Sequence, residues 1–339
     1  MRALNLLEIA MKEITLKAYA KINMSLQITG KRKDGYHNIR SHMQDIGLFD
    51  VIKMKQCSKL ETKRYQFYCL SYGLDVYLNS DNEEIPLNSD NLAIKGINAL
   101  LKELQKRKIA YLSESAEPLS VYLEKRLPVA AGIAGGSGNA AACMLGLNAI
   151  FGYPLSIEEL MQTGANVGAD VPFSIWMNAH KNREVLAGTK GIENTGISAI
   201  VSGIGENVCP IKPVLKNIIM VNPGIGVSTK HAYDAIDSQK IFSEDKNDDF
   251  KNSTNDFEDV IAIEYKEVAE LREFMKSFLS ADFVMMSGSG PTMIAYYDDE
   301  KTASRDYDKL DKFLEKNRES KANNNYFLWR AWLTTTGQS

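Results

Sequence analysis

Residues 128–142 read Pro-Val-Ala-Ala-Gly-Ile-Ala-Gly-Gly-Ser-Gly-Asn-Ala-Ala-Ala, and the interpretation of the whole chain depends on this stretch. It holds four glycines, one hydroxyl (Ser137) and no charged side chain. Glycine permits positive φ and lets a ligand approach the backbone closely, whereas the alanines and leucines that come next favour helix. The stretch predicts a bare loop leading into a helix N-terminus, where unpaired N–H groups and the helix dipole favour an anion such as phosphate.

Three interpretations of this loop compete. The Walker A pattern fails because Gly136 is followed directly by Ser137, with no lysine. The segment from Gly136 to Ala141 does satisfy the dinucleotide pattern G-x-G-x-x-A, but Pro128 stands close ahead, where a strand should deliver the chain. A glycine-alanine turn that serves only packing is the third alternative. The loop composition favours an anion site of another type.

The length, composition and net charge of the chain exclude several protein classes. The 339 residues are enough for two domains, and 44% hydrophobic and 24% charged residues are ordinary for a globular protein. A net charge of -3 argues against a nucleic-acid binder, and no apolar run is long enough to cross a membrane. The four cysteines form no CxxC pair and the four histidines no H-E-x-x-H, so no metal ligand is predicted and a reducing, cytoplasmic location is expected.

Residue patterns along the chain predict mixed helices and strands. Alternation of Ile22, Met24, Leu26 and Ile28 indicates a half-buried strand. A helix capped by Ser89 or Asp90 carries a leucine-rich stripe to Leu104, and Ser156-Ile-Glu-Glu159 is a capping box. Further strands are expected at 49–54, 119–123, 217–221, 283–286, 293–297 and 326–333, and further helices at 140–151, 260–278 and 301–318. Without a regular βαβ alternation, the order indicates an α+β fold.

Other segments are harder to interpret. Five aromatics between Tyr65 and Tyr77 are read as strand core, and 237–259 as a solvated acidic loop. Residues 1–11 lack a signal-peptide cleavage site, and Met11 is an alternative start. Asp170 stands at an element boundary before Val171 and Pro172, where a helix cap is as good an explanation as a functional carboxylate.

The ordered set of motifs resembles the GHMP kinase superfamily. The loop from Pro128 to Ala140 is similar to its second motif, and Ser287-Gly-Ser-Gly290 to its C-terminal glycine turn. One branch of the superfamily also carries motifs similar to Ala20-Lys-Ile-Asn23, Asp34-Gly-Tyr-His37 and Gly168-Ala-Asp-Val-Pro172. The same holds for the segments at 89–92, 222–229 and 255–257, so that the resemblance runs from about residue 17 to about residue 297.

This resemblance implies a GHMP kinase architecture. It has an N-terminal ATP-binding domain like the second domain of ribosomal protein S5 and a C-terminal ferredoxin-like α+β domain, here expected at 11–208 and 209–339. Segments near 56–85 and 179–199 look like insertions. The loop departs from the family at Ala131 and Ala134, where some members carry glycine, and at Gly138, where many carry a second serine.

The resemblance also implies an activity and its residues. The activity is ATP-dependent phosphorylation of a small molecule, cytidine diphosphate-methylerythritol, in non-mevalonate isoprenoid synthesis, with Mg²⁺ bridging phosphate oxygens. Asp170 is the implied general base and Lys21 the implied neutralising cation. Asn23, Tyr36, His37 and Tyr233 are the implied substrate residues: the two tyrosines sandwich the cytosine, His37 reads its edge and Asn23 holds the erythritol. The implied ATP-binding residues are Asn91, Pro128, Val129, Ala130, Ala131, Gly132, Ile133, Ala134, Gly135, Gly136, Ser137 and Gly138.

Three alternatives remain open. One is another GHMP kinase, for mevalonate, homoserine or a sugar; the others are a non-catalytic nucleotide-binding paralogue and a dinucleotide oxidoreductase. Gly35-Tyr-His37 argues against the first, and the presence of both Lys21 and Asp170 against the second. A monomer or weak homodimer is expected.

Overall fold

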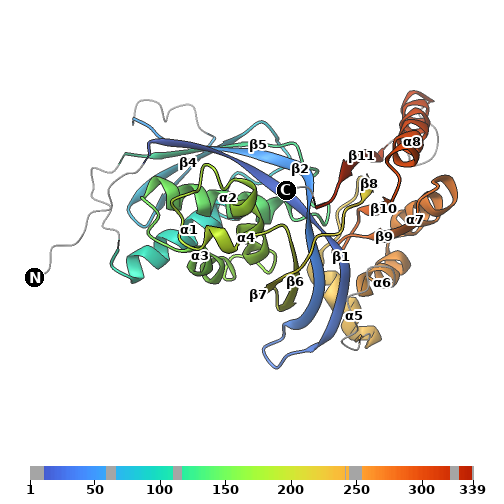
Figure 1. Ribbon diagram of the computed structural model, residues 1–339, viewed down its shortest axis with the longest axis horizontal. Helices are drawn as coiled ribbons and strands as arrows, with labels where there is room; N and C mark the ends of the chain where they lie inside the picture. The colour runs from blue at the N-terminus through green and yellow to red at the C-terminus, as the bar shows by residue number, and fades with distance from the viewer. Residues whose placement is uncertain are drawn as a thin grey trace, which may run out of the picture. The chain divides into compact units, whose positions relative to one another are not determined.

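The computed structural model describes residues 11–58, 66–109, 117–240, 242–243, 254–320 and 328–337 (Figure 1). The chain forms two compact units, each built from separate segments. Unit 1 comprises 1–20, 48–129 and 134–197, and unit 2 comprises 21–47, 130–133 and 198–339. The contiguous boundary expected at 208/209 stays a prediction, since the units take residues from both sides of it.

Two long strands contribute to both units. β1 (Glu13–Lys31) and β2 (His37–Gln56) pair with each other, and β1 begins well before the strand predicted at Ile22. In unit 1 the second half of β2 pairs antiparallel with β5 (Leu119–Glu124). β5 runs parallel to β4 (Leu74–Ser80), and β3 (Phe67–Ser71) completes this side of the sheet.

The helices of unit 1 lie together on one side of these strands (Figure 1). They are α1 (Leu92–Lys106), α2 (Gly135–Ile150), α3 (Ile157–Gly164) and α4 (Val171–Lys181), and α4 is followed by a short 3-10 turn, η2 (Ile192–Asn194). Every residue of α2 from Gly138 to Ile150 is buried, as expected for the central helix of a core. A Cβ on Gly96 of α1 would lie 3.0 Å from the Ala140 carbonyl oxygen, so glycine permits this helix pair to pack closely.

Unit 2 contains the first half of β2, paired with β6 (Ser198–Gly203), and β7 (Asn207–Pro210) beyond it. A second sheet has the order β11-β8-β10-β9, formed by β8 (Asn217–Asn222), β9 (Phe283–Met286), β10 (Met293–Tyr297) and β11 (Arg330–Thr335). Its helices are α5 (Thr229–Gln239), α6 (Asp256–Glu264), α7 (Lys266–Phe278) and α8 (Glu300–Ser320). In sequence order these strands lie 4-1-3-2 with antiparallel neighbours, which confirms the ferredoxin-like, α+β expectation.

Several local predictions were wrong. The helix cap is Asn91, one residue beyond Asp90, because its side chain accepts from the Ala93 N–H. The helix predicted across 260–278 ends at Tyr265, whose extended φ and ψ separate α6 from α7. The aromatics on β3 and after it are not core, since Tyr68 and Tyr72 are exposed; Tyr65 lies outside the described residues.

Most of residues 1–11 and part of the acidic segment 237–259 also lie outside the described residues. Where 237–259 is described, the expected solvated loop is wrong at its ends, since α5 runs to Gln239 and α6 begins at Asp256 with Phe257 buried. Among the helices that are described, none has the length and apolar character needed to cross a membrane.

Candidate active site

The N-terminus of α2 has no side-chain cap. Its N-cap residue is Ala134, at φ +57°, and no side chain makes a capping hydrogen bond to it. The Ala134 carbonyl accepts from the Gly138 N–H, so the N–H groups of Gly135, Gly136 and Ser137 precede the first intrahelical bond. By contrast, α1, α3, α5 and α6 are each capped by a side chain. This terminus is therefore suited to an anion that takes the place of the cap.

Close neighbours favour small residues at this terminus. A Cβ on Gly136 would lie 3.0 Å from Leu92 Cδ1, at the start of α1. A Cβ on Gly138 would lie 3.0 Å from the Tyr19 carbonyl oxygen, which accounts for glycine where many family members carry serine. Asn91 next to Leu92 is buried, and its amide also donates to the Pro86 carbonyl (2.8 Å).

A buried carboxylate holds the entrance to the loop. Asp50 Oδ1 accepts from the Arg126 and Leu127 N–H groups, at 2.7 and 2.9 Å, and Oδ2 forms an ion pair with Lys125. In the amide orientation that satisfies its neighbours, Asn139 donates to Asp50 Oδ2 and accepts from Lys125 Nζ, both at 2.9 Å. Both charged side chains are almost completely buried. Sequence reasoning missed this cluster because Asp50 lies about 75 residues before the loop.

In unit 2, residues 130–133 pack against the second glycine turn. Gly132 has φ +71°, and a Cβ there would lie 2.6 Å from the carbonyl oxygens of both Ser287 and Gly290. Ser287 Oγ donates to the Gly132 carbonyl at 3.2 Å. The two segments approach backbone to backbone, which only glycine permits at this position.

Lys21 and Asn23 are joined to both of these segments. The Lys21 N–H donates to the Ile133 carbonyl at 3.1 Å, and the Asn23 N–H to Ser287 Oγ at 3.4 Å. Lys21 Nζ donates to Asn23 Oδ1 at 2.6 Å, and the Asn23 amide donates to Ser41 Oγ at 2.8 Å. Both side chains are buried inside β1, with Lys21 only 2% exposed.

Two residues of α6 and its cap hold the turn at 287–290. Asn255 donates to the carbonyls of Met286 and Gly288, both at 2.8 Å. Glu258 Oε2 accepts from the Met286 N–H at 2.8 Å. Burial raises the pKa of Glu258, and the Met286 N–H and Arg272 offset this only in part. The sequence singled out Asn255 within a motif, whereas Glu258 carried no signal.

Asp170 occupies the N-cap position of α4, but its side chain makes no capping hydrogen bond. Its backbone is in the helical region (φ −82°, ψ −11°), unlike the extended conformation of a typical capping residue. The side chain is half-buried. Asp170 therefore occupies the cap position of α4 but does not cap the helix through its side chain.

The residues expected to bind a base lie where β2 begins and along α5. The His37 ring stacks on Tyr233, with centroids 4.7 Å apart and planes at 16°, and Phe257 packs edge-on to Tyr233. His37 Nε2 lies 2.7 Å from Asp237 Oδ1, and Lys31 Nζ lies 2.5 Å from Asp237 Oδ2. Lys31, and to a lesser extent His37, lowers the pKa of Asp237. Tyr36 is 62% exposed.

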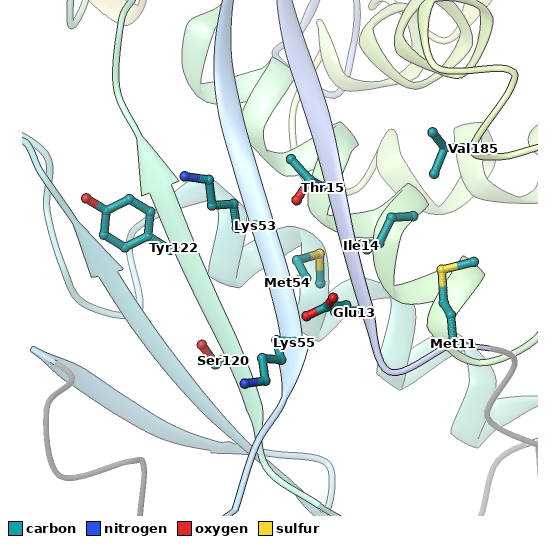
Figure 2. Close-up of a pocket in the computed structure, with 10 residues that line it drawn as sticks. All are labelled: Met11, Glu13, Ile14, Thr15, Lys53, Met54, Lys55, Ser120, Tyr122 and Val185. Carbon is teal, nitrogen blue, oxygen red and sulfur yellow. The ribbon is translucent and has the colours of Figure 1, made fainter.

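Unit 1 also contains a cavity of about 610 Å³ over β1, β2 and β5. Figure 2 shows Lys53, Lys55, Ser120 and Tyr122 among the side chains around it. Lys53 is held by Glu124 at 2.9 Å. No predicted site residue lines this cavity, so it is separate from the candidate site.

Across the described ranges, no group of three or more His, Cys, Asp or Glu side chains is placed to hold a metal ion. Mg²⁺ bound with a nucleotide takes most of its ligands from phosphate and water, with one or two protein carboxylates.

Comparisons with known proteins give the family. The GHMP kinases N terminal domain family matches residues 91–178, and the GHMP kinases C terminal family matches 244–316. A 4-diphosphocytidyl-2-C-methyl-D-erythritol kinase from Clostridioides difficile (strain 630) is 34% identical over 86% of this chain and 88% of its own length. The kinase of that name from Clostridium acetobutylicum is 32% identical over 89% and 98% of the respective chains.

Solved structures agree on the fold. A 4-(cytidine 5'-diphospho)-2C-methyl-D-erythritol kinase structure superposes with a TM-score of 0.65 and 22% identity, covering 96% of this chain and 100% of the other. A homoserine kinase from Cytophaga hutchinsonii gives a TM-score of 0.56 at 12% identity, covering 97% and 96%. The sequence matches, which extend over nearly the whole of both chains, show that this chain belongs to the 4-diphosphocytidyl-2-C-methyl-D-erythritol kinase family of the GHMP kinases.

Proposed function

We propose that this protein uses ATP to phosphorylate the 2-hydroxyl of 4-diphosphocytidyl-2-C-methyl-D-erythritol, in the non-mevalonate route to isoprenoid precursors. The observation that carries this proposal is the 34% identity, over 88% of its length, to a kinase of that name. Homoserine and mevalonate kinases match in fold alone, at 12% identity, and give no comparable support to the other substrates.

The nucleotide part of the proposal rests on the loop at 128–138. Its backbone N–H groups at the uncapped start of α2 would bind ATP phosphates, since nothing in the first turn competes for them. Asn91 and Leu92 begin the helix whose first residue lies against Gly136, which favours adenosine binding there. Ser137 supplies the single hydroxyl of the loop, and Mg²⁺ bound with ATP would neutralise phosphate charge.

Catalysis is assigned to Asp170 and Lys21. Asp170 would accept the proton of the substrate hydroxyl, a role for which a carboxylate not engaged in helix capping is suited. Lys21, which is buried and oriented by Asn23, would stabilise negative charge on the transferred phosphoryl group.

Base recognition is assigned to Tyr36, His37 and Tyr233. A hydrogen bond made through a ring nitrogen of His37 lies in the imidazole plane, so a base that makes it is roughly coplanar with the ring. The Tyr233 ring, stacked on His37 at 16°, would then extend under the base, and Tyr36 would cover the other face. Base–aromatic stacking contributes about 1–3 kcal/mol. Asn23 would contact the erythritol by exchanging its bond to Ser41.

The compartment and assembly belong to the same proposal. Cys57, Cys69, Cys143 and Cys209 are all free thiols, which is typical of a reducing compartment such as the cytoplasm. Burial raises the pKa of Cys143 to about 12, so this thiol is unreactive in the fold. A monomer or weak homodimer remains the expectation.

The test is ADP release measured with the cytidine substrate, mevalonate, homoserine and no acceptor. Rapid turnover with the cytidine substrate alone supports the proposal. Equal or faster turnover with mevalonate or homoserine would replace it with another GHMP kinase activity. Tight ATP binding without turnover on any acceptor would indicate a non-catalytic paralogue.

A further inference from the structure

His37 is buried, and only one of its ring nitrogens has a hydrogen-bond partner among the described residues. Nε2 lies 2.7 Å from Asp237 Oδ1, whereas no described residue bonds to Nδ1. The second oxygen of Asp237 is taken by Lys31, at 2.5 Å. The carboxylate is thus held from two sides and presents Oδ1 to the imidazole.

An ionised carboxylate accepts hydrogen bonds and cannot donate them. Lys31 keeps Asp237 in that form, because it holds the pKa of this carboxyl below its ordinary value. The Nε2 atom of a neutral His37 must therefore carry the proton, and Nδ1 must be the acceptor. The partner of one ring nitrogen sets the tautomer of the ring.

The two pyrimidines differ in what they present at this edge. Cytosine has an amino donor at C4, whereas uracil has a carbonyl acceptor there. An acceptor at Nδ1 bonds to the cytosine amino group and repels the uracil oxygen. The other tautomer would have the opposite preference.

We propose that Asp237 is a positioning residue that determines cytosine specificity, by holding His37 as the Nε2–H tautomer with Nδ1 free to accept from the base. This inference rests on the proposed function, because it takes His37 as the residue that reads the base. It adds a residue on α5, about 200 positions away in sequence, that no motif singled out.

The first experiment needs no substrate. Imidazole ¹⁵N signals of the wild-type enzyme, with His37 assigned by comparison with His37→Gln, report which nitrogen carries the proton. A pyridine-type signal for Nδ1 is expected, and a protonated Nδ1 in the neutral ring would overturn the inference. In Asp237→Asn the amide can donate or accept, so a mixture of tautomers is expected.

The second experiment compares kcat/KM for the cytidine substrate and for its uridine analogue. Asp237→Asn is expected to lower the cytidine-to-uridine ratio by about tenfold to a hundredfold, the effect of losing or mispairing one buried hydrogen bond. Asp234→Asn, one turn earlier on α5 and exposed, is the matched control and should keep the wild-type ratio. An unchanged ratio in Asp237→Asn, alongside normal wild-type turnover of the cytidine substrate, refutes the inference but leaves the proposed function intact. If the wild type does not phosphorylate the cytidine substrate at all, both are refuted.

Discussion

The loop at 128–138 and the turn at 287–290 are both glycine-rich, and each is held at its entrance by a carboxylate, buried in the case of Asp50 and half-buried in that of Glu258. Asp50 accepts from the Arg126 and Leu127 N–H groups, and Glu258 accepts from the Met286 N–H. An asparagine adds a hydrogen bond in each place: Asn139 donates to Asp50 beside the loop, and Asn255 donates to the Met286 carbonyl beside the turn.

The two segments differ in the element to which each one leads and in how the carboxylate charge is balanced. The first leads into α2, whose N-terminus has no side-chain cap, whereas the second leads into β10, where backbone groups are paired in the sheet. Asp50 has a buried lysine as counter-ion, whereas Arg272 lies 3.8 Å from Glu258. Similar glycine patterns therefore leave a helix N-terminus open in one place, where we propose that ATP binds, and permit close backbone packing in the other.

The largest expected effect concerns the proposed catalytic site, which the loop at 128–138 serves. Asp170→Asn removes the proposed base, so kcat should fall about 10²–10⁴-fold with the fold retained. ADP release with the cytidine substrate measures this, and circular dichroism checks the fold. A folded variant with wild-type turnover would remove Asp170 from the mechanism.

The entrance to the first loop is tested by Asp50→Asn. The change leaves the buried Lys125 without a counter-ion, which typically costs about 3–5 kcal/mol of unfolding free energy. Glu124→Gln is the control, since this partly exposed partner of Lys53 is screened by solvent and its loss should be much smaller than that of Asp50. Urea unfolding compares the two variants, and equal stability losses would show that the buried pair has no special role.

The close packing of Gly132 against the turn at 287–290 is tested by Gly132→Ala. The new methyl group meets the Ser287 and Gly290 oxygens and forces a left-handed alanine, which together cost about 2–5 kcal/mol. Gly35→Ala is the matched control, because Gly35 has φ +90° and no neighbour within 4 Å. It should lose only about 1–2 kcal/mol, from backbone strain. A similar loss in both variants would argue against the close backbone approach.

The smallest effect concerns the charge on Glu258. Burial raises the pKa of this carboxyl above its ordinary value of 4.5, so its contribution to stability falls as pH rises from that value through the raised pKa. Glu258→Gln keeps an acceptor for the Met286 N–H and removes this penalty. We expect a gain of roughly 1 kcal/mol or less at pH 7, which disappears below the ordinary pKa. Thermal unfolding between pH 4 and pH 8 measures it, and a loss of stability at pH 7 would contradict a burial penalty at this carboxyl.

The sequence by itself determined what depends on local residue order. Glycines followed by alanines predicted the loop and the start of α2, and strand alternation and the capping box at Ser156 were confirmed. The family motifs led to Lys21 and Asp170 because each motif is contiguous. Local order was insufficient at Tyr265, where one extended residue divides a continuous apolar stripe into two helices.

Only the tertiary structure decided which distant side chains meet. Asp50 reaches Lys125, Asp237 reaches His37, and Gly132 lies against Ser287, although each pair is separated by about 75 to 200 residues. Such contacts arise from strand pairing and from the burial of charge beside compensating groups. A single sequence carries no periodic or contiguous signal for them.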